Sequence, residues 1–136
     1  MNQVTNRRAA LAYGDVATQR SAEDNSPHRV IQLLMESGLQ RIMMAKSYIQ
    51  QKRIPEKGEQ IGLAISVVEG IRASLDMEKG GEMAVNLSSL YEYMKVTLLE
   101  ANLHNDEGKL DEVSGLLAQI KSSWDAIPAQ LAQQGK

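Results

Sequence analysis

Three interruptions of an apolar pattern constrain the fold of this chain more than any other sequence feature. They are "KRIPEKG" at 52–58, "KGG" at 79–81 and "HNDEGK" at 104–109, each rich in turn-forming residues. In the segments between them, apolar residues recur every three or four positions, the period of an amphipathic helix. Short connections between helices of similar length are typical of antiparallel neighbours. We therefore predict an all-α fold, an antiparallel up-down four-helix bundle with helices at about 27–53, 57–79, 82–104 and 107–127.

The two ends of the chain differ in composition from these segments. Residues 1–25 are polar and small, which predicts a flexible N-terminal segment before a bundle domain at 26–128. Inside that segment, "RRAALAYGDV" holds a short apolar island formed by Leu11, Tyr13 and Val16. Residues 129–136 form a polar tail. A chain of 136 residues is long enough to bury one core without disulfides, and this one has no cysteine.

The charge and hydropathy of the chain argue against two classes of partner. A formal net charge of −2, with scattered basic residues, gives no electrostatic basis for binding nucleic acid or an anionic membrane. No apolar run approaches the roughly 20 residues that span a bilayer. The polar N-terminus lacks the apolar region of a signal peptide. We therefore expect a cytoplasmic protein that neither binds nucleic acid nor inserts into a membrane.

The glycine pair Gly80-Gly81 raises the question of a phosphate-binding loop. Such loops connect a strand to a helix and continue into Gly-Lys-Ser/Thr. This pair lies between two helical segments and lacks that continuation. We interpret it as a helix C-cap followed by a tight turn.

No set of residues has the spacing of a catalytic or metal site. His28 is expected in the first turn of one helix and His104 near the end of another, without further ligands at metal-binding spacing. We expect both histidines to be solvated. Ser88 and Ser89 have no histidine nearby in the helical frame to activate them, and Trp124 is expected to anchor packing. The sequence therefore predicts no metal, no cofactor and no enzymatic activity.

A second line of apolar residues distinguishes three of the predicted helices. Each helix has a main stripe sufficient for a core, which in the third includes Met83, Tyr91 and Leu98. The residues that we assign to a binding surface lie on the additional lines: Val30, Leu33, Met44 and Tyr48; Leu63, Val67, Gly70 and Met77; and Val85, Val96, Leu99 and Leu103. Helices that are apolar on two sides are either buried between neighbours or bind one.

Two interpretations of these lines remain open. In the first, grooves on the bundle receive apolar helical segments of another protein. In the second, the lines result from uneven packing or form a homodimer seam. An open apolar groove risks aggregation, so the island of Leu11, Tyr13 and Val16 is expected to fold back as a displaceable cover. The alternative is a disordered tail in which Tyr13 occurs by chance.

Four stretches of the chain carry a family resemblance. They are "SPHRVIQLLMESGLQRI", "IRASLDMEKGGEMAVNLSSLYEYM", "LLEANLHND" and "LDEVSGLLAQIKSSWDAI". These stretches resemble the FliS family, the flagellin-specific export chaperones of bacteria. The resemblance extends from about Tyr13 to Ile127. The serines of "NLSSLYEYM" depart from it, because an acidic residue or alanine is expected there.

The resemblance implies a fold, a function and partners. The fold is an antiparallel four-helix bundle, in agreement with the periodicity. The implied partner is the disordered C-terminal region of flagellin, which becomes helical in apolar grooves of the chaperone and is thereby kept from premature assembly. The implied function is delivery of flagellin to the type III flagellar export apparatus, and some members also contact regulatory proteins. The family's N-terminal tyrosine covers part of the binding surface, and Tyr13 holds the corresponding position. The alternative function is a self-associating structural bundle.

Overall fold

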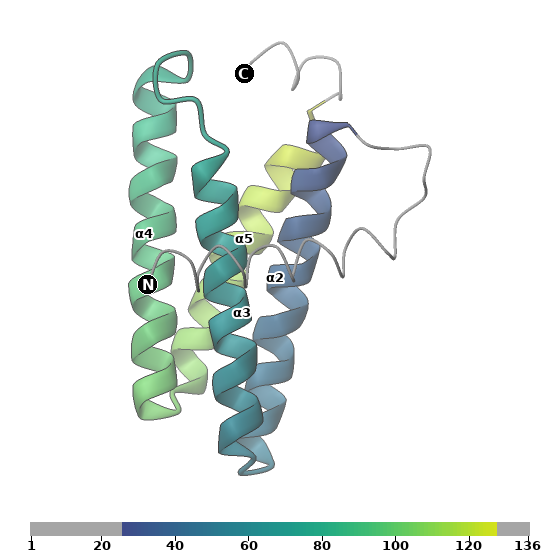
Figure 1. The fold of residues 1–136 in the computed structure, drawn as a ribbon, viewed down its shortest axis with the longest axis vertical. Coiled ribbons are helices and arrows are strands. Elements are labelled where there is room, and N and C mark those ends of the chain that lie inside the picture. Colours follow the sequence, from purple (N-terminus) through teal and green to yellow (C-terminus); the bar gives the residue numbers. More distant parts are fainter. Residues whose placement is uncertain (1–25, 128–136) are drawn as a thin grey trace.

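The computed structural model describes residues 26–127. They form four helices joined by short turns: α2 (Pro27–Gln50), α3 (Ile54–Ala73), α4 (Gly81–His104) and α5 (Glu107–Asp125). Successive helices run in opposite directions (Figure 1), which confirms the predicted all-α antiparallel four-helix bundle. The predicted N-terminal segment, with Leu11, Tyr13 and Val16, and the polar tail lie outside the described residues.

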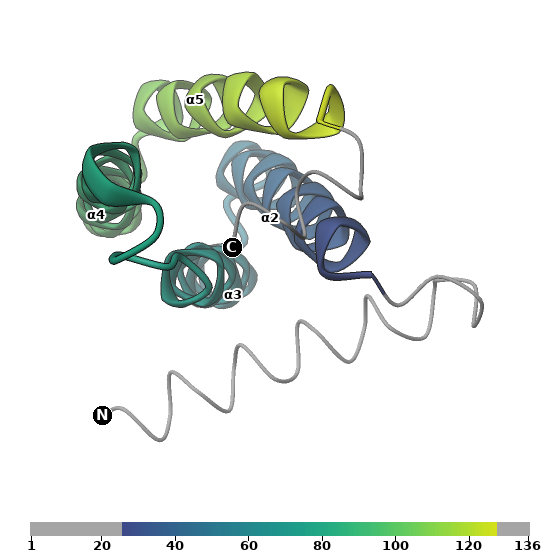
Figure 2. The ribbon, with the colours of Figure 1, turned by 90° about the horizontal axis from the view of Figure 1, so that it is seen from above.

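The four helices are arranged as a ring when the bundle is viewed along its length (Figure 2). The packed pairs are α2 with α3, α3 with α4, α4 with α5, and α5 with α2, and α2 and α3 pack most extensively. Gly38 on α2 permits the close approach of both α5 and α3, because an added Cβ would lie 3.1 Å from Leu117 Cδ2 of α5 and 3.3 Å from Val67 Cγ1 of α3. The ring leaves each helix an outer side.

One core joins the inner sides of the helices. Its largest fully buried hydrophobic side chains are Met35, Ile61, Val67, Val68, Ile71, Met94, Leu98, Leu110, Val113 and Leu117. Complete burial of such a side chain contributes about 1.5–3 kcal/mol relative to exposure, so this cluster stabilises the bundle. Met83 departs from its predicted place in the core and is 72% exposed. It lies in the first turn of α4, at the end of the ring.

Side-chain caps begin two of the helices. Ser26 Oγ accepts a hydrogen bond from the Arg29 amide at 3.1 Å, and the Asp106 carboxylate accepts one from the Lys109 amide at 3.2 Å. Each cap satisfies an amide that the helix itself leaves unpaired. The helix predicted to begin at 57 instead begins at Ile54, because proline is tolerated in a first helical turn.

The turn before α4 ends α3 earlier than the predicted residue 79. α3 stops at Ala73, and the Asp76 carboxylate accepts hydrogen bonds from two backbone amides of the turn, at 3.1 and 2.9 Å. The Gly80 amide then donates to the Asp76 carbonyl at 2.8 Å. Gly80 therefore ends a turn, as predicted, but Gly81 already begins α4, and neither glycine caps α3, whose C-cap is Ser74. Gly80 is the N-cap of α4.

Candidate protein-binding site

Four apolar side chains of α4 point away from the core. Val85, Val96, Leu99 and Leu103 are 49%, 45%, 50% and 77% exposed. At about 100° per residue these positions fall on one side of the helix, and we call them the α4 face. The face extends about 27 Å, at about 1.5 Å per residue. Its length and shape suit a second helix lying alongside.

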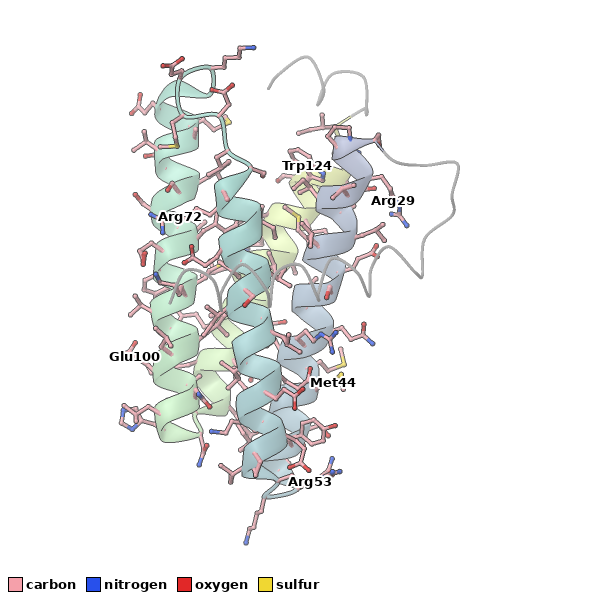
Figure 3. The ribbon with its side chains drawn as sticks, viewed as in Figure 1. Arg29, Met44, Arg53, Arg72, Glu100 and Trp124 are labelled. Atoms are coloured by element: carbon pink, nitrogen blue, oxygen red, sulfur yellow. The ribbon has the colours of Figure 1, made fainter. Side chains whose placement is uncertain are left out.

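Polar pairs hold α4 against its neighbours, and one of them lies on the α4 face itself, because at about 100° per residue Glu92 falls between Val85 and Leu99. Arg72 reaches from α3 (Figure 3) to the Glu92 carboxylate at 2.9 Å, and Lys95 binds the same carboxylate at 3.2 Å. Hydrogen bonds from Lys95 and Arg72 lower the pKa of Glu92. Beside the face, the Tyr93 hydroxyl donates to the Glu112 carboxylate of α5. An apolar surface that also carries a carboxylate suits an amphipathic helix, which presents both apolar and polar side chains.

Two predicted surface residues are buried, so the expectation that they lie on an exposed face is wrong. Val67 is 1% exposed because it packs against α2 at Gly38, where an added Cβ would lie 3.3 Å from Val67 Cγ1. Leu33 is 8% exposed. Val30, one turn earlier on the same side of α2, packs against the core cluster. This side of α2 is therefore not a separate outward face.

The remaining predicted residues of the first two helices are less open than the α4 face. Those that are partly exposed are Val30, Met44, Tyr48, Leu63 and Gly70. Tyr48 is covered on one ring face by the Arg53 guanidinium, whose carbon lies 5.1 Å from the ring centroid. Met77 is 47% exposed but lies in the turn between α3 and α4, beyond the helical line predicted for it.

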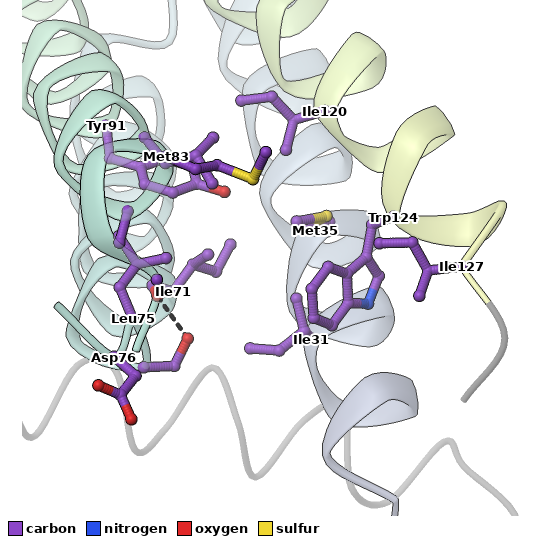
Figure 4. Close-up of a pocket in the computed structure, with 14 residues that line it drawn as sticks. Ile31, Met35, Ile71, Leu75, Asp76, Met83, Tyr91, Ile120, Trp124 and Ile127 are labelled. Carbon is purple, nitrogen blue, oxygen red and sulfur yellow. Dashed lines mark hydrogen bonds between the residues drawn. The ribbon is translucent and has the colours of Figure 1, made fainter. Parts of the chain in front are cut away.

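A cavity of about 310 Å³ opens at the end of the bundle where α2 begins and α5 ends (Figure 4). All four helices and the turn before α4 contribute to its lining: Ile31, Met35, Ile71, Ser74, Leu75, Asp76, Gly80, Met83, Ala84, Leu87, Tyr91, Ile120, Trp124 and Ile127. The cavity was not predicted from the sequence, because most of these residues fall on the core stripes of their helices. The available signal was the large side chains in terminal helical turns, such as Met83 and Trp124, where fewer neighbours cover them.

His28 and Trp124 form a clasp between α2 and α5 at the cavity rim. The Trp124 indole Nε1 donates to the His28 carbonyl at 2.9 Å, and His28 Nε2 lies 2.8 Å from the Trp124 carbonyl. The two rings stack with centroids 5.0 Å apart. His28 is 6% exposed, so the prediction of a solvated histidine is wrong. Trp124 packs against the core cluster, which confirms its predicted role as an anchor.

Tyr91 brings a hydroxyl group to this apolar cavity. The residue is 2% exposed, and its ring extends from α4 toward the cavity (Figure 4). The hydroxyl oxygen is not among the fully buried, unpaired polar atoms of residues 26–127. Burial raises the pKa of Tyr91 to about 12, so the group stays a neutral donor at neutral pH.

The part of the chain that the structure describes contains no cluster of three or more histidine, aspartate or glutamate side chains placed to hold a metal ion. Over the same residues, no helix combines the length and the apolar character needed to cross a membrane. The features there that a ligand could use include the α4 face and the end cavity.

Comparison with known proteins identifies the family. Residues 9–131 match the family model of the flagellar protein FliS. The chain is 49% identical to the flagellar secretion chaperone FliSB of Pseudomonas aeruginosa, over 88% of this chain and 95% of the relative. It is 38% identical to the flagellar secretion chaperone FliS of Vibrio cholerae, over 91% of each chain, and 39% identical to that of Salmonella typhimurium, over 90% and 92%. These matches confirm the resemblance seen in the sequence, and the chain belongs to the FliS family.

Proposed function

We propose that the protein is a cytoplasmic export chaperone for flagellin. It binds the disordered C-terminal segment of flagellin, prevents premature polymerisation and aids delivery to the flagellar type III export apparatus. It acts by binding rather than by catalysis and needs no cofactor. Support comes from relatives named flagellar secretion chaperones and, above all, from the exposed apolar side chains of the α4 face.

The α4 face is the principal docking surface in this proposal. Val96, Leu99 and Leu103 present apolar side chains that no other helix of residues 26–127 covers. A filament subunit has terminal apolar surface intended for neighbouring subunits, and an amphipathic helix formed from it would match this strip. Each Å² of apolar surface buried in this way contributes about 25 cal/mol.

The affinity should be useful but reversible. Fixing the backbone of each client residue costs about 1–2 kcal/mol, which offsets much of the gain from burying apolar side chains. Coupled folding and binding therefore yields a complex that can be released at the export apparatus without ATP hydrolysis.

Other predicted residues extend this surface in the proposal. The partly exposed Val30, Met44, Tyr48, Leu63 and Gly70, together with Met77, would contact further parts of the client. The island of Leu11, Tyr13 and Val16 would cover apolar surface before flagellin binds. Contacts with regulatory proteins stay a prediction from the family resemblance.

A direct test measures binding of a fluorescent flagellin C-terminal peptide to the full chain by anisotropy. Val96→Asp places a charge in the middle of the α4 face and should weaken binding at least tenfold, about 1.4 kcal/mol. The matched control is Ala118→Asp, which adds the same charge at an exposed position of α5. Full affinity in Val96→Asp, with helical circular dichroism unchanged, would contradict the proposal.

The alternative function, a self-associating bundle, uses the same exposed side chains as a seam between two copies. Sedimentation equilibrium of the full chain, with and without the peptide, separates the two functions. The chaperone should form a one-to-one complex with the peptide. A stable dimer that the peptide does not alter would favour the seam.

A further inference from the structure

The charged side chains around the α4 face are distributed unevenly. Glu82 is exposed in the first turn of α4, and Glu100 extends from the outer side of the same helix (Figure 3). At about 100° per residue, both fall about 60° from Val85, on the same side of the α4 face. Glu112 of α5 lies on this side as well, because its carboxylate accepts the hydrogen bond of the Tyr93 hydroxyl. We call Glu82, Glu100 and Glu112 the acidic flank.

Within residues 26–127, Lys109 is the cation paired with the acidic flank. Its ammonium lies 3.9 Å from the Glu100 carboxylate, which is longer than a hydrogen bond, and the Glu100 side chain is 51% exposed. An exposed pair at this distance compensates little of either charge, because water screens both groups. The acidic flank therefore keeps an excess of negative charge that faces solvent beside the apolar side chains of the α4 face.

The charges on the opposite side of the α4 face are balanced. The Lys95 ammonium lies 3.2 Å from the Glu69 carboxylate and 3.2 Å from the Glu92 carboxylate. Arg72 binds the Glu92 carboxylate at 2.9 Å. Two cations and two carboxylates therefore compensate one another between α3 and α4. The charge beside the α4 face is thus one-sided, negative toward α5 and balanced toward α3.

A second copy of the chain does not complement this surface. Two copies that dock through their α4 faces place either their acidic flanks or an acidic flank and a balanced side against each other, depending on their relative direction. Neither arrangement brings an unpaired cation to the acidic flank, and the first brings like charges together, which weakens binding. A complementary partner supplies cations beside apolar side chains. An amphipathic helix with Lys or Arg along one edge of its apolar stripe has this arrangement.

We propose that the α4 face binds a basic amphipathic helix of its client protein, with Lys or Arg side chains along the edge that meets the acidic flank. This inference rests on the proposed function in one respect, namely that a helix docks on the α4 face, and it adds the charge and the direction of that helix. A helix turned end for end on the face exchanges its two edges. The basic edge therefore determines the direction in which the client helix lies.

Two designed fluorescent peptides test the charge of the docked helix. Both form an amphipathic helix with the same leucine stripe, and one edge of this stripe carries lysines in the first peptide and glutamates in the second. Anisotropy measured with the full chain at low salt should show about tenfold tighter binding of the lysine peptide. Added salt should reduce this difference, because it screens exposed charges. Equal affinities of the two peptides at low salt would overturn the proposal.

A double variant of the chain tests whether the acidic flank causes the preference. Glu82→Gln combined with Glu100→Gln should lower the affinity for the lysine peptide about fivefold. The matched control combines Glu36→Gln with Glu59→Gln, which removes two exposed carboxylates of α2 and α3 and should leave the affinity unchanged. Equal losses in the two double variants would show a general effect of net charge and would overturn the proposal.

The direction of the bound peptide provides a readout that net charge alone does not move. A third peptide carries the lysines on the other edge of the leucine stripe and should bind in the reverse direction. With a spin label at the peptide N-terminus, one lysine peptide should broaden the methyl signals of Val85 and the other those of Leu103, about 27 Å along α4. The same direction for both peptides would overturn the proposal.

Other occupants of the α4 face give different results. If the peptides bind only after residues 1–16 are removed, the chain's own N-terminal segment occupies the face and the proposal is wrong. If the full chain forms a dimer that Val96→Asp dissociates, a second copy occupies the face and the proposal is also wrong.

Failure of this inference is distinguishable from failure of the proposed function. If the lysine and glutamate peptides bind equally and Leu99→Ala weakens both, helices dock on the α4 face without a charge preference, so this inference fails while the proposed function stands. If the lysine peptide binds tenfold more tightly but the flagellin C-terminal peptide does not bind, this inference holds and flagellin is not the client.

Discussion

Val67 on α3 and Val96 on α4 lie on the outer lines of neighbouring helices, yet Val67 is 1% exposed and Val96 is 45% exposed. This difference in exposure comes from the neighbouring helix. Val67 meets α2 at Gly38, where the missing side chain lets the two helices approach closely. α4 contacts α3 and α5 through its inner and lateral sides, and none of the described helices covers Val96. A surplus apolar line therefore becomes core or exposed surface according to how closely the next helix packs.

The largest expected effect is on the free energy of unfolding, when an aspartate replaces each of these two valines in turn. Val67→Asp buries a carboxylate without a partner and should lower the free energy of unfolding by several kcal/mol, about 3–5. Val96→Asp places the same group in solvent and should change it by less than about 0.5 kcal/mol. Urea denaturation followed by circular dichroism measures both. Equal losses at the two positions would mean that the α4 face is part of the core.

Alkaline pH should distinguish the inward and outward tyrosines of α4. The pKa of Tyr91 is raised from 10.0 to about 12 by burial, so the unfolded chain loses this proton first as the pH rises. Stability linked to Tyr91 is therefore complete below pH 10 and decreases from about pH 10 to 12, by up to about 1.4 kcal/mol per pH unit. Urea denaturation midpoints measured from about pH 9 to about pH 12 follow this decrease, and Tyr91→Phe should make it smaller. Tyr93→Phe should flatten it less, because the hydrogen bond to Glu112 also raises the pKa of Tyr93 but that side chain is exposed to solvent.

Shortening a side chain of the α4 face should weaken client binding without changing the fold. Leu99→Ala removes most of a side chain that is 50% exposed in the free protein. Because a buried leucine contributes about 1.5–3 kcal/mol, we expect a loss in flagellin-peptide affinity of roughly tenfold, measured by calorimetry. Met43→Ala on α2 serves as the control for loss of an exposed apolar side chain. A similar loss in both variants would show that binding lacks a defined face.

The smallest expected effect is the change in the free energy of unfolding when alanine replaces each of two helical glycines. Gly115 has open space around an added Cβ, so Gly115→Ala should raise the free energy of unfolding by about 0.5–1 kcal/mol through helix propensity. Gly38→Ala should lower it by about 1 kcal/mol, because the added methyl group meets Leu117 and Val67 within 3.3 Å. Thermal unfolding of both variants provides the measurement. Stabilisation by Gly38→Ala would contradict the close approach of α2 and α3.

Features that depend on residues near in sequence were predictable. The caps at Ser26 and Asp106 depend on local sequence alone, because each side chain accepts from the amide three residues later. The stretch "KGG" indicates a turn because glycine has wide backbone freedom. The apolar period was sufficient to predict four helices and the main stripes of the core. Even here, the boundary at Pro55 was misplaced, because proline starts a helix as readily as it ends one.

Features that depend on a distant neighbour were not predictable. His28 was expected in solvent, but the end of α5 returns to it through Trp124. Val67 was assigned to a surface because no local signal shows that Gly38 lies opposite it. The end cavity escaped prediction for the same reason, since its walls come from all four helices. The outward positions Val85, Val96, Leu99 and Leu103 were predicted as a surface line and are exposed, whereas their contact with flagellin stays a prediction.

Methyl NMR of the full chain, titrated with the flagellin C-terminal peptide, tests most directly whether the α4 face is the docking surface. The account predicts that the methyl signals of Val85, Val96, Leu99 and Leu103 shift and gain intermolecular contacts, while those of the buried Val67 and Leu98 keep their positions. Binding of the peptide with the four signals of the α4 face unchanged would contradict it.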